Sequence, residues 1–117
     1  GRTGKATLPR AYEAPAHDDG YRVLVDRLWP RGVSKANARI DLWLKEVAPS
    51  TALRQWFGHD PARWTGFKQR YRTELKHNPA WPEPPALAQQ QPLTLVYAAR
   101  DQAHNEAVVL KQLLEQD

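Results

Sequence analysis

The sequence predicts an α/β fold: a compact single domain with a small, mostly parallel sheet flanked by helices. Two segments rich in aromatic, aliphatic and β-branched residues, 21–25 and 93–98, are typical of buried strands. Helical patterns lie between these segments and after the second one, and strands that alternate with helices favour parallel pairing. One core is sufficient for a chain of 117 residues.

The N-terminal segment is expected to add a strand to this sheet. Residues 1–5 are predicted to be disordered or to derive from an expression tag, so that the single α/β domain spans residues 6–117. A short first strand is expected over residues 7–12 despite Pro9, because proline is tolerated in edge strands.

The region after the strand at 21–25 combines a helix signal with an alternating pattern. Ser34 is a suitable N-cap for a short helix over residues 35–38. Beyond it, Ile40, Leu42 and Leu44 recur at every second position and favour a strand over 40–45. A helix also fits this stretch, with apolar positions at Ile40, Trp43, Leu44 and Val47.

Two helices are predicted in the middle of the chain. Ser50 as N-cap and Gly58 after the last turn bound a short helix over residues 51–57. Asp60 before Pro61 marks a second helix start, although His59 beside Asp60 also fits a metal or acid–base pair. The helix that follows is amphipathic and cationic on its outer faces, with apolar residues at Trp64, Phe67, Tyr71 and Leu75.

The C-terminal third begins with a proline-rich break. Four prolines between residues 79 and 85 predict an extended connector, followed by a brief segment over 86–91. The strand at 93–98 and a terminal helix over 105–115 complete the domain, with Asp101 near the start of that helix.

Composition excludes several kinds of site. Without cysteine the chain has no disulfide, thiolate metal site or cysteine nucleophile, and its four histidines lack the spacing of a helical zinc pair. No glycine-rich phosphate loop or nucleophile elbow occurs, so neither a metal nor a cofactor is expected. A net charge of +4 weakly favours anionic partners.

The location of the protein is also predicted from composition. Since no apolar run of about 18 residues and no basic leader is present, we expect a cytoplasmic protein that does not bind membranes. The oligomeric state stays open at this point.

The loop after the strand at 21–25 is the first candidate site. In open α/β sheets, ligands bind at the carboxyl ends of strands. Arg27, Trp29, Arg31 and Lys35 follow this strand closely, and forked arginine hydrogen bonds beside an aromatic face suit a phosphate-bearing ligand.

A purely structural interpretation of the same loop is also open. Here Leu28 and Trp29 face the core, Pro30 and Gly32 form a turn, and the arginines pair with acidic residues or with solvent.

The loop after the strand at 93–98 is the second candidate site, and the two loops meet if the strands are parallel neighbours. His104 fits a general acid or base that Asp101 orients. Asn105 lies at the start of a helix, where free backbone N–H groups favour a bound anion. Alternatively, Asp101 is only a helix cap and His104 a surface residue.

Several strings of residues resemble the YeaO-like bacterial family, classed as domain of unknown function number 488. The resemblance covers about residues 6 to 116 and rests on Val25 to Gly32, Trp43 to Lys45, Ala48 to Ser50, Trp56 to Asp60 and Leu95 to Ala99. It implies a small cytoplasmic α/β protein without an established activity, and it supplies no catalytic residues to carry over.

The chain departs from that family in one helix. Where the family often has acidic residues, this sequence has Ala62, Thr65 and Gly66. The helix after Pro61 is therefore more basic and has a weaker helix propensity.

Two functions of different classes fit the candidate residues. The first is a binding domain for nucleic acid or a nucleotide, which Arg27, Trp29 and Arg31 contact. The second is an enzyme of the hydrolase or phosphotransfer type that uses Asp26, Asp101 and His104. A third possibility is a protein interaction module built on exposed Trp29, Trp43 or Trp81.

Overall fold

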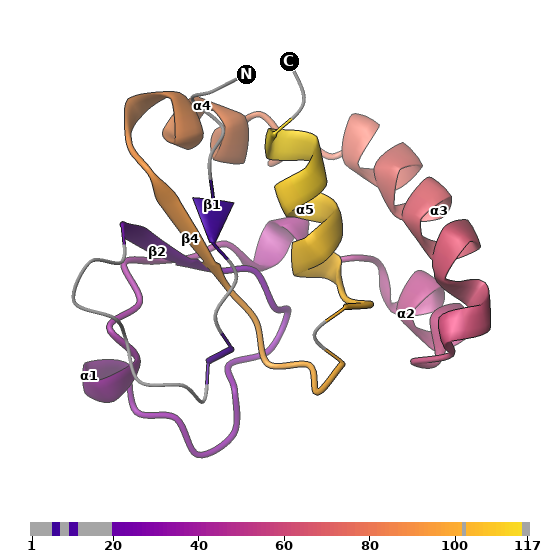
Figure 1. The fold of residues 1–117 in the computed structure, drawn as a ribbon, viewed down its shortest axis with the longest axis horizontal. Coiled ribbons are helices and arrows are strands. Elements are labelled where there is room, and N and C mark those ends of the chain that lie inside the picture. The colour runs from indigo at the N-terminus through magenta and orange to yellow at the C-terminus, as the bar shows by residue number, and fades with distance from the viewer. Residues whose placement is uncertain (1–5, 8–9, 12–19, 102, 116–117) are drawn as a thin grey trace.

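The computed structural model describes residues 6–7, 10–11, 20–101 and 103–115 (Figure 1). The prediction for residues 1–5 lies outside these ranges. So does residue 12, at the end of the first expected strand.

A parallel sheet forms the centre of the domain, as the sequence predicted. Its strands are β1 (Ala6–Thr7), β2 (Tyr21–Leu24), β3 (Leu42–Trp43) and β4 (Leu93–Val96). They are arranged in the order β1-β4-β2-β3, and every pairing is parallel. The two segments predicted as buried strands, β2 and β4, are therefore neighbours at the centre of the sheet.

One outer strand is shorter than expected, and the other is described only in part. Of the strand expected over 7–12, Thr7 belongs to β1 and Arg10 forms a bridge with Tyr97, whereas residues 8, 9 and 12 lie outside the described ranges. The strand expected over 40–45 is reduced to β3, and a 3-10 turn over Lys45–Val47 follows it. The first part of this region is thus a strand, and the part after it is helical, as the alternative interpretation allowed.

The caps predicted from sequence bound the helices of the middle region. The side chain of Ser34 caps α1 (Lys35–Ala38), and Ser50 caps α2 (Thr51–Phe57) by accepting from the N–H of Leu53. Gly58 ends α2 in the left-handed conformation at φ 54°, where glycine carries no side-chain penalty. Asp60 accepts from the N–H of Ala62 in a 3-10 turn over Pro61–Arg63, and α3 (Trp64–Lys76) continues from there.

The prediction of an extended connector over 79–85 is wrong. Helix α4 (Glu83–Gln90) begins inside it and carries Pro84 and Pro85 in its first turn. Proline breaks a helix in its interior, but in the first turn its missing N–H would have had no partner in any case. The terminal helix α5 (Glu106–Leu114) follows β4, with Asn105 as N-cap.

The two faces of the sheet are covered differently. Val23 and Leu95 point into the main core, which α2, α3, α4 and α5 cover. Their neighbours Leu24 and Val96 point to the opposite face and pack with Trp29 and Trp43, among others, in a smaller cluster, because side chains alternate along a strand. The larger helices lie on one side of the sheet (Figure 1).

Tyr71 ties α3 to the segment before α2. Its ring is fully buried in the main core, and its hydroxyl donates a hydrogen bond to the carbonyl oxygen of Val47. Burial raises the pKa of Tyr71, and the negative charges of Glu106, Glu74 and Asp26 raise it further. The phenol therefore stays neutral and available as a donor.

We expect Tyr71→Phe to lower the free energy of unfolding by about 1 to 2 kcal/mol, because the buried carbonyl of Val47 loses its donor. Urea denaturation followed by circular dichroism measures this loss. Tyr21→Phe, at a half-buried position in β2, is the control and should change stability by less than about 0.5 kcal/mol. Equal losses in the two variants would contradict a role for the Tyr71 hydroxyl.

Candidate functional site

The two candidate loops meet at the carboxyl ends of the central strands. Leu24 and Val96 are paired in the register of β2 and β4, and both strands end there. Just beyond, the backbone N–H of Ala98 donates to Oδ2 of Asp26 at 2.9 Å. The two loops were expected to meet if their strands were parallel neighbours, and the structure confirms this.

A cavity of about 470 Å³ opens between these loops and helix α2. Its lining comes from segments far apart in sequence: the loop 26–31, residues 48–49, α2, and the loop leading into α5. The charged and polar residues that line it are Asp26, Arg27, Arg31, Arg54, His59, His104, Asn105 and Glu106.

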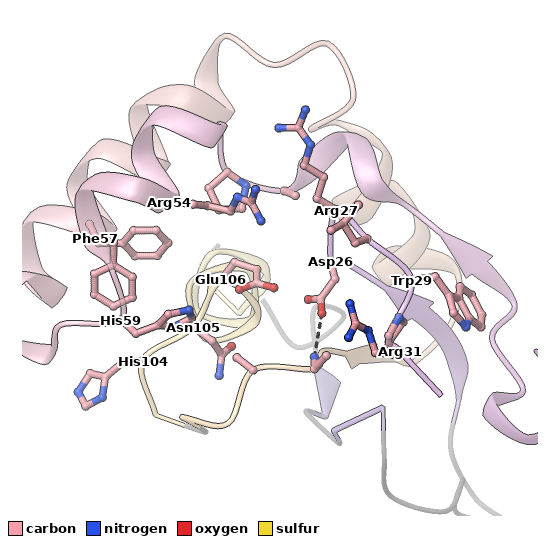
Figure 2. Close-up of a pocket in the computed structure, with 17 residues that line it drawn as sticks. Asp26, Arg27, Trp29, Arg31, Arg54, Phe57, His59, His104, Asn105 and Glu106 are labelled. Carbon is pink, nitrogen blue, oxygen red and sulfur yellow. Dashed lines mark hydrogen bonds between the residues drawn. The ribbon is translucent and has the colours of Figure 1, made fainter. Parts of the chain in front are cut away.

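Two carboxyl groups point toward one another in this cavity (Figure 2). Asp26 follows β2, and Glu106 is the first residue of α5. Oδ1 of Asp26 is shielded from solvent and receives no hydrogen bond from an N–H or hydroxyl group of the described residues. A proton on Glu106 supplies the donor that this oxygen lacks.

Glu106 is the acid of the pair. Burial raises its pKa well above the ordinary 4.5, and the hydrogen bond and the charge of Asp26 raise it further. The positive charge of Arg54 acts in the opposite direction but is a smaller effect. Two close carboxyl groups cannot both ionise cheaply, and the raised pKa of Glu106 favours a proton on that residue.

Three arginines contribute positive charge around the same cavity. Arg54 extends from α2, and Arg27 and Arg31 come from the loop after β2 (Figure 2). Arg27 donates to Oγ1 of Thr51 at 2.6 Å, and all three side chains belong to exposed residues. None of them takes part in an ion pair within the described part of the chain.

The residues between Arg27 and Arg31 differ in part from the purely structural interpretation of this loop. Leu28 was expected in the core, but 71% of its surface is exposed, and Pro30 is buried instead. Trp29 is half-buried and packs in the smaller cluster on the second face of the sheet. Gly32 makes the expected turn at φ 81°.

Trp29 lines the cavity but is held by its own neighbours. Its indole N–H donates to the carbonyl of Val33 at 2.6 Å, and its ring packs edge to face against Trp43 with centroids 5.5 Å apart. Lys35, the other expected ligand residue, is exposed in α1 and does not line the cavity.

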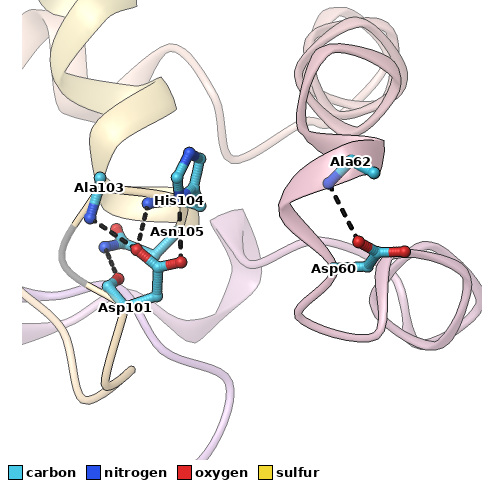
Figure 3. A network of polar contacts seen from close by, with 6 residues as sticks. All are labelled: Asp60, Ala62, Asp101, Ala103, His104 and Asn105. Atoms are coloured by element: carbon cyan, nitrogen blue, oxygen red, sulfur yellow. Dashed lines mark hydrogen bonds and ion pairs between the residues drawn. The ribbon is translucent and has the colours of Figure 1, made fainter.

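Asp101 and His104 lie side by side, but the cap of α5 is Asn105 and not Asp101 (Figure 3). Oδ1 of Asp101 accepts from the backbone N–H groups of Ala103 and His104, as in a cap, and Oδ2 lies 2.9 Å from Nδ1 of His104. The pKa of Asp101 is lowered, first by the Ala103 N–H and then by His104. His104 lines the cavity, whereas Asp101 lies behind it.

Asn105 is occupied as a structural residue. Its side-chain oxygen accepts from the N–H of Val108, and its amide donates to the carbonyl of Asp101 at 2.8 Å. It is buried and closes the first turn of α5. Both polar groups of its side chain are thus engaged before any ligand binds.

Sequence reasoning missed Arg54 and Glu106. An arginine on a short helix and an acid in a first helical turn are ordinary features, since acids are favoured there by the helix dipole. His59, which the sequence placed beside a cap, also lines the cavity at a positive φ of 57°. Only the packing of α2 and α5 against the strand ends brings these residues together.

The described residues contain neither a metal-binding cluster nor a membrane-spanning helix. No group of three or more histidine or acidic side chains in these ranges is arranged to hold a metal ion. Within the same ranges, no helix has the length and apolar character needed to cross a bilayer.

We expect Glu106→Gln to change how stability depends on pH. The folded protein keeps the Glu106 proton above pH 4.5, where the unfolded chain loses it, so wild-type stability falls as pH rises toward the raised pKa. Glutamine has no proton to lose and donates to Asp26 at every pH. The stability of the variant relative to wild type should therefore increase with pH, by at most about 1.4 kcal/mol per unit.

Urea titrations between about pH 4 and pH 8 measure this difference. Glu115→Gln is the control: it removes the same charge from the other end of α5, where Glu115 forms an ion pair with Lys111 at 3.3 Å. A constant difference between wild type and Glu106→Gln across the range would mean that Glu106 titrates normally.

Comparisons with known proteins agree with the resemblance found in the sequence. A family model described as the inactive DUF488-N3 subclade matches residues 5–117. The uncharacterised protein Rv3073c of Mycobacterium tuberculosis is 43% identical over 97% of this chain and 96% of its own. No solved structure matches significantly.

A second relative connects the chain to the family that its motifs indicated. The uncharacterised protein YeaO of Escherichia coli is 42% identical over 106 residues, which cover 90% of this chain and 92% of that protein. With a family model matching nearly every residue as well, the chain belongs to the YeaO-like DUF488 family.

Proposed function

We propose that this protein binds a phosphate-bearing ligand, a nucleotide or a nucleotide of a nucleic acid, without chemical turnover. The observation that carries the proposal is the set of three arginines around a cavity at the carboxyl ends of parallel strands. Guanidinium groups bind phosphate oxygens through paired hydrogen bonds, and this edge of an α/β sheet is where ligands generally bind.

The size and walls of the cavity support the same class of ligand. A volume of about 470 Å³ falls within the range of small-molecule sites. Phe57 and Phe67 stack with ring centroids 4.5 Å apart and contribute apolar surface to the lining, as does Trp29. A base or sugar ring can pack on such surfaces while its phosphate meets the arginines.

The family description favours binding over catalysis. The model that matches this chain is described as an inactive subclade. The arginine-rich cavity needs no catalytic group to hold an anion, so binding alone uses the features described above. A cytoplasmic location, expected from the sequence, stays a prediction.

Removing Arg31 and Arg54 should weaken binding at least ten-fold. In the variant Arg31→Gln with Arg54→Gln, we expect this loss for a fluorescently labelled single-stranded DNA at low salt. Each lost phosphate contact should also reduce the slope of log affinity against log salt by about 0.7. Lys76→Gln, at the far end of α3, is the charge control. If wild type does not bind the DNA or a nucleoside monophosphate at low salt, the proposal is wrong.

The pair of Asp101 and His104 favours a second candidate, a hydrolase or phosphotransfer enzyme. A histidine whose Nδ1 lies 2.9 Å from a carboxylate is oriented for proton transfer, and His104 lines the same cavity as Asp26. In this alternative Asp26, Asp101 and His104 act on a substrate whose charge the arginines hold.

Turnover assays separate the two candidates. Under the binding proposal, incubation with p-nitrophenyl phosphate or with a dinucleotide should release no product above the buffer background. Hydrolysis that His104→Ala abolishes, while circular dichroism shows an unchanged fold, would replace the binding proposal with the enzymatic one. The Asp60 cap, which lies outside the cavity, offers Asp60→Asn as control.

The proposed interaction module rests on weaker support. Trp29, Trp43 and Trp81 are each half-buried and pack against core clusters. An anchor residue for a partner protein needs an accessible side chain. This function therefore stays a prediction without a specific observation in its favour.

A further inference from the structure

We propose that Asp26 and Glu106 form the recognition element of the cavity and select a nucleobase, which presents an N–H donor beside a hydrogen-bond acceptor. This inference rests on the proposed function and names the class of ligand that the arginine-lined cavity takes. It follows from the hydrogen bonds that the two carboxyl groups can form with a ligand in place of the one between them.

Asp26 offers one fixed acceptor to a ligand. Oδ2 is engaged by the N–H of Ala98, which holds the carboxylate in one orientation. Oδ1 is the remaining oxygen, and among the described residues its donor is the carboxyl group of Glu106 when that group carries a proton. A ligand N–H that replaces this donor forms a hydrogen bond to a carboxylate oxygen, which is stronger than one to a neutral oxygen.

Glu106 offers the complementary donor. Its carboxyl group points toward Asp26 from the first turn of α5 (Figure 2). Burial and the neighbouring Asp26 raise the pKa of Glu106, which favours the protonated acid. When a ligand N–H takes over Oδ1 of Asp26, the hydroxyl of Glu106 is released to donate to an acceptor on the ligand.

Together the pair presents one acceptor and one donor side by side. Cytosine and adenine carry an amino group next to a ring nitrogen, and uracil carries a ring N–H next to a carbonyl oxygen. Each of these edges complements the pair. Inorganic phosphate and sugar phosphates lack such an edge, so they can use only the arginines.

The charges in the cavity fit a ligand of this kind. The carboxyl pair accepts a polar but uncharged head group, and the three arginines suit the phosphate that is attached to it. Apolar surface from Phe57 and Trp29 adjoins both. A bare anion placed directly at the pair would face the acceptor oxygens of Asp26 and be repelled.

Calorimetric titration with matched ligands tests the proposal on the unaltered protein. We expect uridine 5′-monophosphate to bind at least ten-fold more tightly than ribose 5-phosphate. Its affinity should also be at least ten-fold higher than that of 3-methyluridine 5′-monophosphate, because the methyl group removes the N–H donor. Cytidine 5′-monophosphate should bind as well as the unmodified uridine compound.

Variants identify the residues responsible. Asp26→Asn keeps an acceptor for Ala98 but turns a donor into the cavity, and it should reduce the preference over ribose 5-phosphate to about two-fold or less. Glu106→Ala should reduce this preference by the same amount. This variant leaves the hydrogen bond between Asp26 and the Ala98 N–H in place. Glu115→Gln, which lies outside the cavity, should behave as wild type toward all four ligands.

The outcomes distinguish this inference from the proposed function. Equal affinity for all four ligands, lost together in Arg31→Gln with Arg54→Gln, would overturn the role of the carboxyl pair and leave phosphate binding in place. A preference that persists in both Asp26→Asn and Glu106→Ala would assign recognition to other residues. If none of the ligands binds, both proposals fail.

Discussion

The hydrogen bond between the Ala98 N–H and Asp26 is the interaction on which the arrangement of the cavity depends. It joins the chain just beyond the paired ends of β2 and β4, the two central strands. An N–H that donates to a carboxylate forms a stronger bond than one that donates to a neutral oxygen. The loop with the arginines and the loop that leads into α5 are therefore held in one relative position, and the first turn of α5 follows from it.

This constraint has an electrostatic consequence. Asp26 accepts the Ala98 N–H while it is held beside Glu106, with its Oδ1 shielded from solvent. Burying a carboxylate next to a second acid lowers stability unless a proton or a cation compensates. The raised pKa of Glu106 favours a proton on that residue, and Arg54 contributes positive charge nearby. Unfavourable groups retained in a cavity are typical of sites kept for binding rather than for stability.

The elements that the sequence predicted well are those with local signals. Ser50 and Gly58 bound α2 as expected, because capping involves atoms within one helical turn. The extended connector before β4 was wrong, since the rule against proline in helices does not extend to the first turn, where Pro84 and Pro85 lie. The expectation that Leu28 faces the core was wrong because the burial of a loop side chain depends on tertiary contacts, which no pattern within the loop records.

By itself, the sequence determined the parallel α/β class, the caps of the helices and the family, and it indicated that Asp26, Arg27 and Arg31 follow a strand end. Only the tertiary structure decided the strand order and brought Arg54 and Glu106 into the lining of the same cavity. The physical reason is distance along the chain. Propensity and capping act over a few residues, whereas Asp26, Arg54 and Glu106 meet because β2 and β4 are neighbours and α2 and α5 pack over their ends.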